Sequence, residues 1–205
     1  MRIGILTDVH EHVPHLRSAL ERCRREGVEQ LIVLGDVFDT GQRLTETVEL
    51  LAHAGIVGVW GNHELGLCHQ PEERIRRTYA GPVLEFMSTL RPRLELEDCL
   101  FTHGLPCWDP TDPVVYYLGE RAESAAGLAR SFEAVPHTVL FLGHFHRWLA
   151  ATPRGCLDWD GTAPLQFQPG ERYLVVIAAV ADGWCAVYDT AARRLEPQRL
   201  TPSGG

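Results

Sequence analysis

Two histidines at residues 144 and 146 are the first sign of chemistry in this chain. They follow the apolar run VLFLG in the stretch VLFLGHFHR, which spans 139–147. Imidazole is a common neutral metal ligand, so His144 and His146 could bind a metal ion. A structural role, in which the rings only make hydrogen bonds, fits the pair equally well. The choice depends on what the rest of the chain supplies.

The same arrangement occurs at four other places in the chain. In each of them an apolar run is followed at once by a carboxylate, an amide or an imidazole. The side chains of all five motifs, in chain order, are Asp8, His10, Asp36, Asp39, Asn62, His63, Glu64, His103, His144 and His146. In open α/β sheets the carboxyl ends of the strands face one crevice, where ligands bind. We therefore expect these groups, far apart in the sequence, to converge in space.

The chemistry of this set predicts a site for two metal ions. Its members offer oxygen and nitrogen ligands and no thiolate, a mixture that suits divalent ions such as Mn²⁺, Fe²⁺ or Zn²⁺. They are too many for one ion, whereas two ions about 3.5–4 Å apart, bridged by a carboxylate and a water or hydroxide, would use them. The alternative, that each group merely caps a turn, is strong for one motif and weak for five in succession.

The segments between the motifs predict the elements that position them. Apolar runs at 2–7, 31–35 and 56–61 have the length of buried strands. The intervening segments 13–27 and 43–55 carry apolar residues at helical spacing and end in glycine. This alternation of strands and helices predicts a parallel sheet with right-handed crossovers.

The second half of the chain is rich in short apolar runs and predicts strands that are partly antiparallel. A helix is expected around 118–134. The tripeptide ADG at 181–183 separates the runs 172–180 and 184–190, and it predicts a hairpin between them. The continuous apolar runs are typical of a sheet that is buried on both faces.

Length and composition restrict the class of protein. A chain of 205 residues with 45% hydrophobic content fits one compact domain, which we place at 1–200, followed by a flexible tail at 201–205. The net charge of −8 argues against broad nucleic-acid binding, which needs a basic surface. No apolar window is long enough for a membrane span. Asp8 and His10 interrupt what would be the apolar region of a signal peptide, so we expect a cytoplasmic protein. The oligomeric state is not indicated.

Taken in order, the five motifs resemble those of the calcineurin-like metallophosphoesterases. They read DVH at 8–10, GDVFD at 35–39, GNHE at 61–64, THG at 102–104 and GHFH at 143–146, and they span about two thirds of the chain. The resemblance implies a four-layer α/β/β/α sandwich with mixed sheets. It also implies a dinuclear metal centre at one edge of that sandwich.

The resemblance further implies a role for each residue. The metal ligands it implies are Asp8, His10 and His146 for the first ion, Asn62, His103 and His144 for the second, and Asp36 as the bridge between them. His63 resembles the family's catalytic histidine, which binds no metal, and Asp39 resembles the carboxylate that orients it. Mn²⁺ is the ion we expect, with Fe or Zn as alternatives. The role of Glu64 stays open.

The activity that the resemblance implies is hydrolysis of small phosphate esters, either diesters or monoesters. A hydroxide that bridges the metal ions would attack phosphorus, and His63 would act as general acid on the leaving alkoxide. Thr40 stands where the phosphoprotein-phosphatase branch has arginine, which weakens assignment to that branch. A phosphoprotein phosphatase, a nucleotide pyrophosphatase on the same centre and a non-catalytic metal-binding scaffold are the alternatives.

Three further features are left open by the sequence. Glu11 stands where many relatives have glycine, and its carboxylate could face solvent or support the site. Arg147 could contact a phosphate or lie in solvent. The loop 105–121 follows His103 and is rich in proline and aromatic residues. It is either a wall of the substrate site or a loop whose aromatic side chains only pack beneath it.

Overall fold

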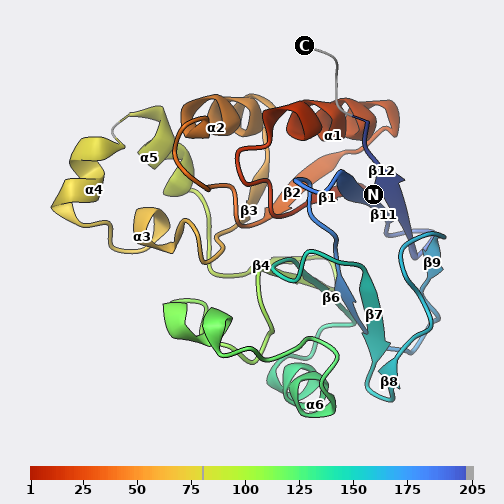
Figure 1. Cartoon of the computed structure of the whole chain (residues 1–205). Helices are drawn as coiled ribbons and strands as arrows, with labels where there is room; N and C mark the ends of the chain where they lie inside the picture. The colour runs from red at the N-terminus through yellow and green to blue at the C-terminus, as the bar shows by residue number, and fades with distance from the viewer. Residues whose placement is uncertain (80, 202–205) are drawn as a thin grey trace.

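The protein folds into two mixed β-sheets packed face to face, with helices on the outer faces (Figure 1). The computed structural model describes residues 1–79 and 81–201, so all but the first residue of the predicted tail at 201–205 lies outside the described residues. In Figure 1, α1 and α2 cover one sheet and α6 lies on the opposite side of the molecule, against the other sheet. The predicted four-layer α/β/β/α sandwich is confirmed.

The first sheet contains the parallel strands predicted in the first half of the chain. Its strands, in spatial order, are β3 (Val57–Val59), β2 (Gln30–Leu34), β1 (Arg2–Leu6), β11 (Trp184–Asp189), β12 (Arg194–Arg199) and β9 (Leu165–Gln166). β1, β2 and β3 are parallel, and the crossovers between them are α1 (Val13–Arg25) and α2 (Leu44–His53). β11, β12 and β9 add antiparallel pairs beyond β1.

The second sheet is built from the second half of the chain. Its strands, in spatial order, are β4 (Leu94–Leu96), β5 (Cys99–Thr102), β6 (Val139–Leu142), β10 (Tyr173–Val176), β7 (Leu149–Thr152) and β8 (Gly155–Cys156). β5, β6 and β10 are parallel, and antiparallel strands flank them. The 3₁₀ helix η1 (Pro113–Tyr117) and the helix α6 (Ala125–Ala134) connect β5 to β6.

The helix expected around 118–134 begins later than predicted. It starts after Ser124, whose hydroxyl accepts the backbone N–H of Gly127 at 3.0 Å and so caps α6. Three short helices, α3 (Leu65–Cys68), α4 (Glu73–Thr78) and α5 (Pro82–Met87), follow β3. No described helix is both long and apolar enough to cross a bilayer.

The central strands are buried on both faces, as their continuous apolar runs predict. The side chains packed between the two sheets, none of them exposed, include Ile3, Ile5, Ile32, Phe101, Phe141 and Val175. On the outer faces, Leu6 and Val33 join the cluster under α1 and α2, and Leu140 joins the cluster with Leu128 of α6. Burial stabilises by ~1.5–3 kcal/mol for each such side chain, so the strand ends are rigid supports for the loops that follow.

The predicted hairpin around 181–183 is wrong. β10 belongs to the second sheet and β11 to the first, so the two strands do not pair. The run 172–180 is long because the chain leaves β10 after Val176 and crosses to the first sheet, where the N–H of Val180 donates to the carbonyl of Thr7 at 2.9 Å. Residues 177–180 are at most 3% exposed. A buried crossing segment therefore has the same apolar composition as a strand.

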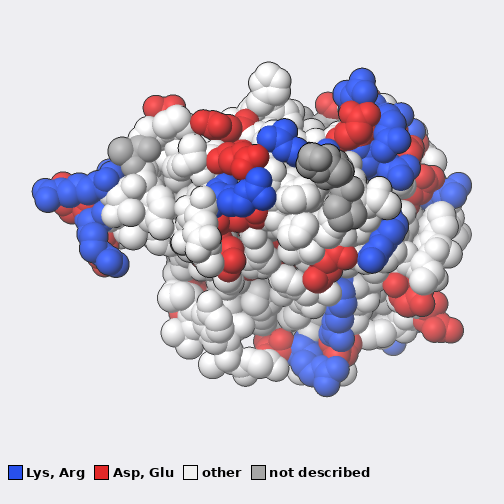
Figure 2. All heavy atoms as spheres, turned by 45° about the horizontal axis from the view of Figure 1, so that its top comes forward, with Lys and Arg blue, Asp and Glu red and all other residues white. Residues whose placement is uncertain are grey.

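Charges of both signs are interspersed on the face that carries α1 and α2 (Figure 2). Arg24 pairs with Glu21 at 2.9 Å, and Arg17 pairs with Glu46 at 3.0 Å. Arginines engaged in this way do not form the continuous basic surface that nucleic-acid binding needs. The prediction against broad nucleic-acid binding stays a prediction from the net charge.

Candidate metal centre

The five motifs lie in the loops after β1, β2, β3, β5 and β6, and hydrogen bonds from backbone N–H groups join the loops after β1, β2 and β6. The N–H of Asp8 donates to the carbonyl of Gly35 at 3.0 Å, and the N–H of His10 to that of Asp36 at 3.0 Å. The N–H of His144, after β6, donates to Asp8 Oδ2 at 3.0 Å. The groups converge, as their positions at strand ends predict.

Five of the seven predicted metal ligands have a left-handed backbone. The φ angles are 49° at Asp8, 44° at His10, 53° at Asp36, 67° at His144 and 51° at His146. This conformation costs a residue that carries a side chain ~1–2 kcal/mol. Strain of this kind collects at functional sites, where the surrounding structure holds it in place. The fold therefore tolerates local strain in order to aim these side chains at one point.

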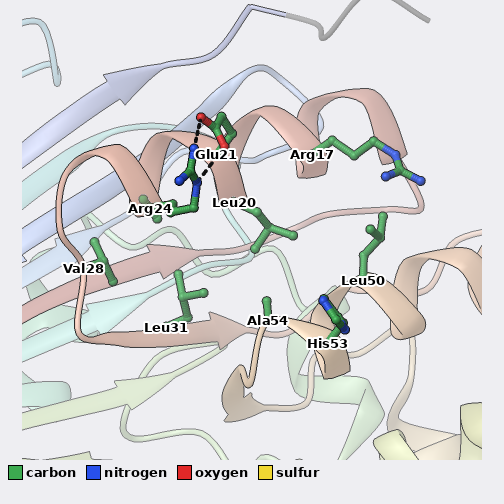
Figure 3. Close-up of a pocket in the computed structure, with 10 residues that line it drawn as sticks. Arg17, Leu20, Glu21, Arg24, Val28, Leu31, Leu50, His53 and Ala54 are labelled. Atoms are coloured by element: carbon green, nitrogen blue, oxygen red, sulfur yellow. Dashed lines mark hydrogen bonds and ion pairs between the residues drawn. The ribbon is translucent and has the colours of Figure 1, made fainter.

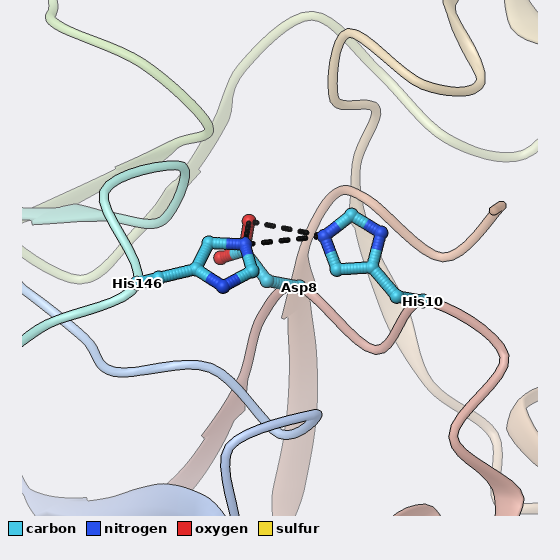
Figure 4. A group of neighbouring side chains, drawn as sticks. All are labelled: Asp8, His10 and His146. Atoms are coloured by element: carbon cyan, nitrogen blue, oxygen red, sulfur yellow. Dashed lines mark hydrogen bonds and ion pairs between the residues drawn. The ribbon is translucent and has the colours of Figure 1, made fainter.

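Asp8, His10 and His146 form the first group of potential ligands (Figure 4). Asp8 Oδ1 lies 3.2 Å from His146 Nε2 and 4.0 Å from His10 Nε2, and the two Nε2 atoms are 3.1 Å apart. Oδ2 of Asp8 accepts the hydroxyl of Thr7 at 2.6 Å, whereas Oδ1 is buried and accepts no hydrogen bond from the described residues. A buried carboxylate oxygen facing two ring nitrogens fits a divalent ion.

Asp36, His103 and His144 form the second group, and Asn62 lies among them. Asn62 Oδ1 is 3.0 Å from His103 Nε2 and 3.1 Å from His144 Nδ1. His103 Nδ1 lies 2.6 Å from the carbonyl of Leu34. A carbonyl can only accept, so Nδ1 carries the proton and the Nε2 lone pair of the neutral ring is left for a metal ion.

Asp36 faces both groups. Its Oδ1 lies 3.3 Å from His103 Nε2, in the second group, and its Oδ2 lies 3.8 Å from His10 Nε2, in the first. The side chain is almost fully buried. One carboxylate with an oxygen toward each group has the geometry of a bridging ligand.

His63 lies at the centre, close to Asp36 and His10. His63 Nε2 is 3.9 Å from Asp36 Oδ2, and its ring packs edge-on against that of His10 at 4.7 Å. The close grouping of His63 with His10 and Asp36 means that it could also bind metal. Among the described residues, no hydrogen bond or ion pair joins the Asp39 side chain to His63. Asp39 is exposed, in a bend after β2, so its orienting role stays a prediction.

The charges of the centre favour a cation among its imidazoles. Burial acts to lower the pKa of His103, but the charge of Asp36 and a hydrogen bond to it raise that pKa to about 10. Burial acts to raise the pKa of Asp36, but the charge of His103 holds it well below its usual range. Burial, together with the charge of His103, lowers the pKa of His144 to about 4. A divalent ion can supply the positive charge in place of a proton, so the residues present fit a metal centre.

Glu64, whose role the sequence left open, holds two of the loops together. Its side chain is fully buried and accepts the backbone N–H groups of Asp36 at 2.8 Å, Val37 at 3.0 Å and Gly61 at 2.6 Å. Glu11 does the same for the segment 39–43, from which it accepts three backbone N–H groups. Neither carboxylate faces solvent, and both act on the centre through the loops that they support.

At Gly61 and Gly143, neighbouring side chains come too close to leave room for a Cβ atom. A Cβ on Gly61 would collide with the carboxylate of Asp36, and a Cβ on Gly143 would collide with the hydroxyl of Thr7. Thr7 itself, which the sequence did not single out, donates to Asp8 Oδ2. Its position next to the first motif, at a strand end, is the only signal that could have found it.

The loop 105–121 packs aromatic side chains beneath it, and one of its tyrosines contacts a predicted metal ligand. Trp108 and Tyr116 are buried, and the ring of Tyr116 packs 5.4 Å from that of His144. Tyr117 is 70% exposed, and its hydroxyl accepts the Asn62 Nδ2 amide at 3.1 Å. Arg147 is paired with Glu123 and therefore already has an anionic partner.

A cavity lies away from the motifs. It has a volume of about 600 Å³ and lies between α1 and α2, with Leu20, Leu31 and Leu50 among its lining residues (Figure 3). Arg24 at its rim is engaged by Glu21. The lining includes none of the predicted site residues, so this cavity is separate from the metal centre.

Comparison with known proteins places the chain in a family. Residues 1–177 match the model of the calcineurin-like phosphoesterase superfamily domain. The chain belongs to this superfamily. The resemblance of the five motifs is thereby confirmed, and the matched model describes a phosphoesterase domain.

Two curated proteins of Methanocaldococcus jannaschii are similar to part of the chain. A phosphodiesterase is 32% identical over 106 residues, which are 51% of this chain and 59% of that protein. An uncharacterised protein is 29% identical over 65 residues, which are 32% of this chain and 27% of that protein. The chain therefore matches less than two thirds of the length of either relative.

Solved structures share the fold. A metallophosphoesterase from Sphaerobacter thermophilus has a TM-score of 0.79 at 24% identity, and the match covers 99% of this chain and 89% of that one. A structure described as a novel archaeal phosphodiesterase has a TM-score of 0.56 at 18% identity, over 98% of this chain and 100% of that one. At these identities the likeness supports the architecture alone.

Proposed function

We propose that this protein is a phosphoesterase that uses two divalent metal ions to hydrolyse small phosphate esters. The observation that carries the proposal is the position of Asp36, whose two carboxylate oxygens face His103 at 3.3 Å and His10 at 3.8 Å. A single carboxylate shared by two ligand groups is typical of two-metal hydrolytic sites. Membership of the phosphoesterase superfamily supports the reaction class.

The proposal gives each group of side chains a task. The ligands would be Asp8, His10 and His146 for one ion, Asn62, His103 and His144 for the other, and Asp36 for both. When bound, such ions supply activation of water and neutralisation of charge on phosphoryl oxygens. Mn²⁺ is the ion we propose, with Fe or Zn as alternatives, because mixed carboxylate, amide and imidazole ligands suit all three.

His63 is proposed as the general acid. Its side chain is 35% exposed, so the ring can reach a leaving group that approaches from solvent. General acid catalysis by such a group contributes ~10²–10⁴-fold to the rate. Asp39 is exposed and would turn toward His63 to orient it.

Small diesters are the substrates we propose. The phosphodiesterase of Methanocaldococcus jannaschii, 32% identical over 106 residues, supports diester hydrolysis. Thr40 replaces the arginine expected of a phosphoprotein phosphatase. The net charge of −8 would repel extended polyanions away from the metal ions.

Turnover by reconstituted protein tests the proposal. The protein is stripped with a chelator, loaded with Mn²⁺ and assayed on bis(p-nitrophenyl) phosphate, p-nitrophenyl phosphate, a dinucleoside polyphosphate and a folded phosphoprotein. We expect the diester to be hydrolysed, the activity to be lost with the metal and restored with it, and the Asp36→Asn variant to be inactive. A preference for the polyphosphate or the phosphoprotein would favour the corresponding alternative activity. No turnover of any substrate would favour a non-catalytic scaffold.

A further inference from the structure

Exposed apolar side chains gather on one segment beside the metal centre. Val114 is 57% exposed, Tyr117 is 70% exposed and Leu118 is 72% exposed. Among the described residues, the one other large hydrophobic side chain of comparable exposure is Val57, at 42%. Apolar groups exposed together, in contrast to single ones, mark a binding surface.

The segment is held firmly from below. Tyr116, which lies between these residues in η1, is buried and packs against Trp108 at 5.5 Å and His144 at 5.4 Å. The Asp112 side chain accepts the backbone N–H of Val114 at 2.9 Å, which fixes the first turn of η1. The exposed side chains are therefore presented by a supported turn.

Tyr117 ties this surface to the centre. Its hydroxyl accepts the amide Nδ2 of Asn62 at 3.1 Å, which leaves the amide oxygen facing His103 at 3.0 Å and His144 at 3.1 Å. The ring of Tyr117 thus stands beside a predicted metal ligand with most of its surface in solvent. A group attached to a phosphate at the centre would lie within reach of this ring.

Three arginines that follow the segment in the chain are already engaged. Arg121 and Arg147 both pair with Glu123, and Arg130 pairs with Glu120. Recognition at this surface therefore rests on apolar and aromatic contact, and a further phosphate group finds no free partner among these arginines.

We propose that Tyr117, with Val114 and Leu118 beside it, binds an aromatic group of the substrate, such as an aryl ester or a nucleobase, by stacking. This inference rests on the proposed phosphoesterase function and names its substrate class: phosphodiesters that carry an aromatic group in addition to the leaving group. Stacking of an aromatic ring on such a platform changes affinity by roughly tenfold.

Two diesters that share a leaving group test the proposal. Phenyl p-nitrophenyl phosphate and methyl p-nitrophenyl phosphate both release p-nitrophenolate and differ in the remaining ester group. The readout is kcat/KM of the phenyl ester divided by kcat/KM of the methyl ester. Comparing this ratio between variants cancels the intrinsic reactivity of the two esters. We expect Tyr117→Leu to lower the ratio about tenfold, mainly through KM of the phenyl ester. Tyr117→Phe keeps the ring and should keep the ratio, even where loss of the hydroxyl alters turnover of both esters through Asn62.

The matched control is Val57→Ser, which removes an exposed hydrophobic side chain from β3 and should leave the ratio unchanged. Val114→Ser and Leu118→Ser should each lower the ratio by less than Tyr117→Leu. An unchanged ratio in Tyr117→Leu, with the wild type active, would overturn the inference and leave the proposed function standing. Equal losses for both esters in Tyr117→Leu and Tyr117→Phe would overturn it too, because Tyr117 would then act only on Asn62. No hydrolysis of either ester by the wild type would contradict the proposed function itself.

Discussion

The Glu11 carboxylate holds the segment that contains Asp39 by accepting hydrogen bonds from backbone N–H groups of that segment. Glu11 Oε1 accepts the N–H of Asp39 at 3.0 Å and that of Gly41 at 2.6 Å, and its Oε2 accepts the N–H of Arg43 at 2.8 Å. Glu11 has a left-handed backbone, with φ of 56°, and is only 7% exposed. A glutamate is kept in a conformation that suits glycine because its carboxylate satisfies three N–H groups of the loop after β2.

Substitutions of Glu11 should therefore separate the stabilisation by its hydrogen bonds from the cost of its left-handed backbone. Glu11→Ala leaves three partly buried N–H groups without an acceptor and should lower the free energy of unfolding by ~1–3 kcal/mol. Glu11→Gly loses the same hydrogen bonds but relieves the left-handed backbone, so it should be about 1 kcal/mol more stable than Glu11→Ala. Chemical denaturation of the three proteins measures both differences. Equal stability of Glu11→Ala and the wild type would show that the carboxylate does not support the loop.

His63→Ala should keep the metal ions and the fold while losing turnover. His63 is assigned to proton donation, so the loss should be ~10²-fold or more for an alkyl leaving group and smaller for p-nitrophenolate, which hardly needs protonation. Steady-state kinetics on a matched pair of diesters, with elemental analysis of the same preparations, gives both readouts. Loss of a metal ion in this variant would make His63 a ligand, and equal losses for both leaving groups would contradict the acid role.

The metal-free protein should lose stability as the pH rises above neutral. The pKa of His103 in the folded state is about 10, above its ordinary value of 6.5, because Asp36 favours the charged ring. The stabilisation is therefore fully present below about pH 6.5 and is lost as the pH rises toward 10. Denaturation with a chelator present, between about pH 6.5 and 9, should show the decline in the wild type and a flatter profile in His103→Gln. A wild-type profile as flat as that of His103→Gln would show that the pair is not charged in the folded protein.

The convergence of the ligands could be predicted because each one follows a strand. Asp8 and His144 are 136 positions apart and follow strands of different sheets, β1 and β6, yet the N–H of His144 donates to Asp8 Oδ2. The buried strands are recognisable in the sequence as apolar runs. The polar residues that follow each run can then be identified as candidates for the site. Most of the architecture and the grouping of the centre follow from these two features.

The supporting carboxylates could not be assigned from the sequence. Glu64 and Glu11 bind backbone N–H groups, which nearly every residue offers, so no side-chain pattern reveals their partners. The relation of Asp39 to His63 depends on how an exposed side chain in a bend is turned, and a position near a strand end does not determine it.

One strand prediction failed and one strand, β12, was not predicted, for separate physical reasons. The run 172–180 continues as a buried crossing between sheets, and apolar composition does not distinguish this from a longer strand. β12 contains Pro197, which argues against a strand because proline lacks an N–H. It is tolerated because β9 pairs with β12 only at Arg194 and Leu195 and leaves Pro197 without a neighbour on that side.

The metal content of reconstituted protein tests the central claim most directly, that one carboxylate joins two metal ions. Wild-type protein loaded with Mn²⁺, freed of excess metal and measured by elemental analysis should contain two ions per chain. Asp36→Asn should lose more metal than the Asn62→Ala or His146→Ala variants, because Asp36 faces both ligand groups. One ion or none in the wild type, or full occupancy in Asp36→Asn, would contradict the dinuclear centre.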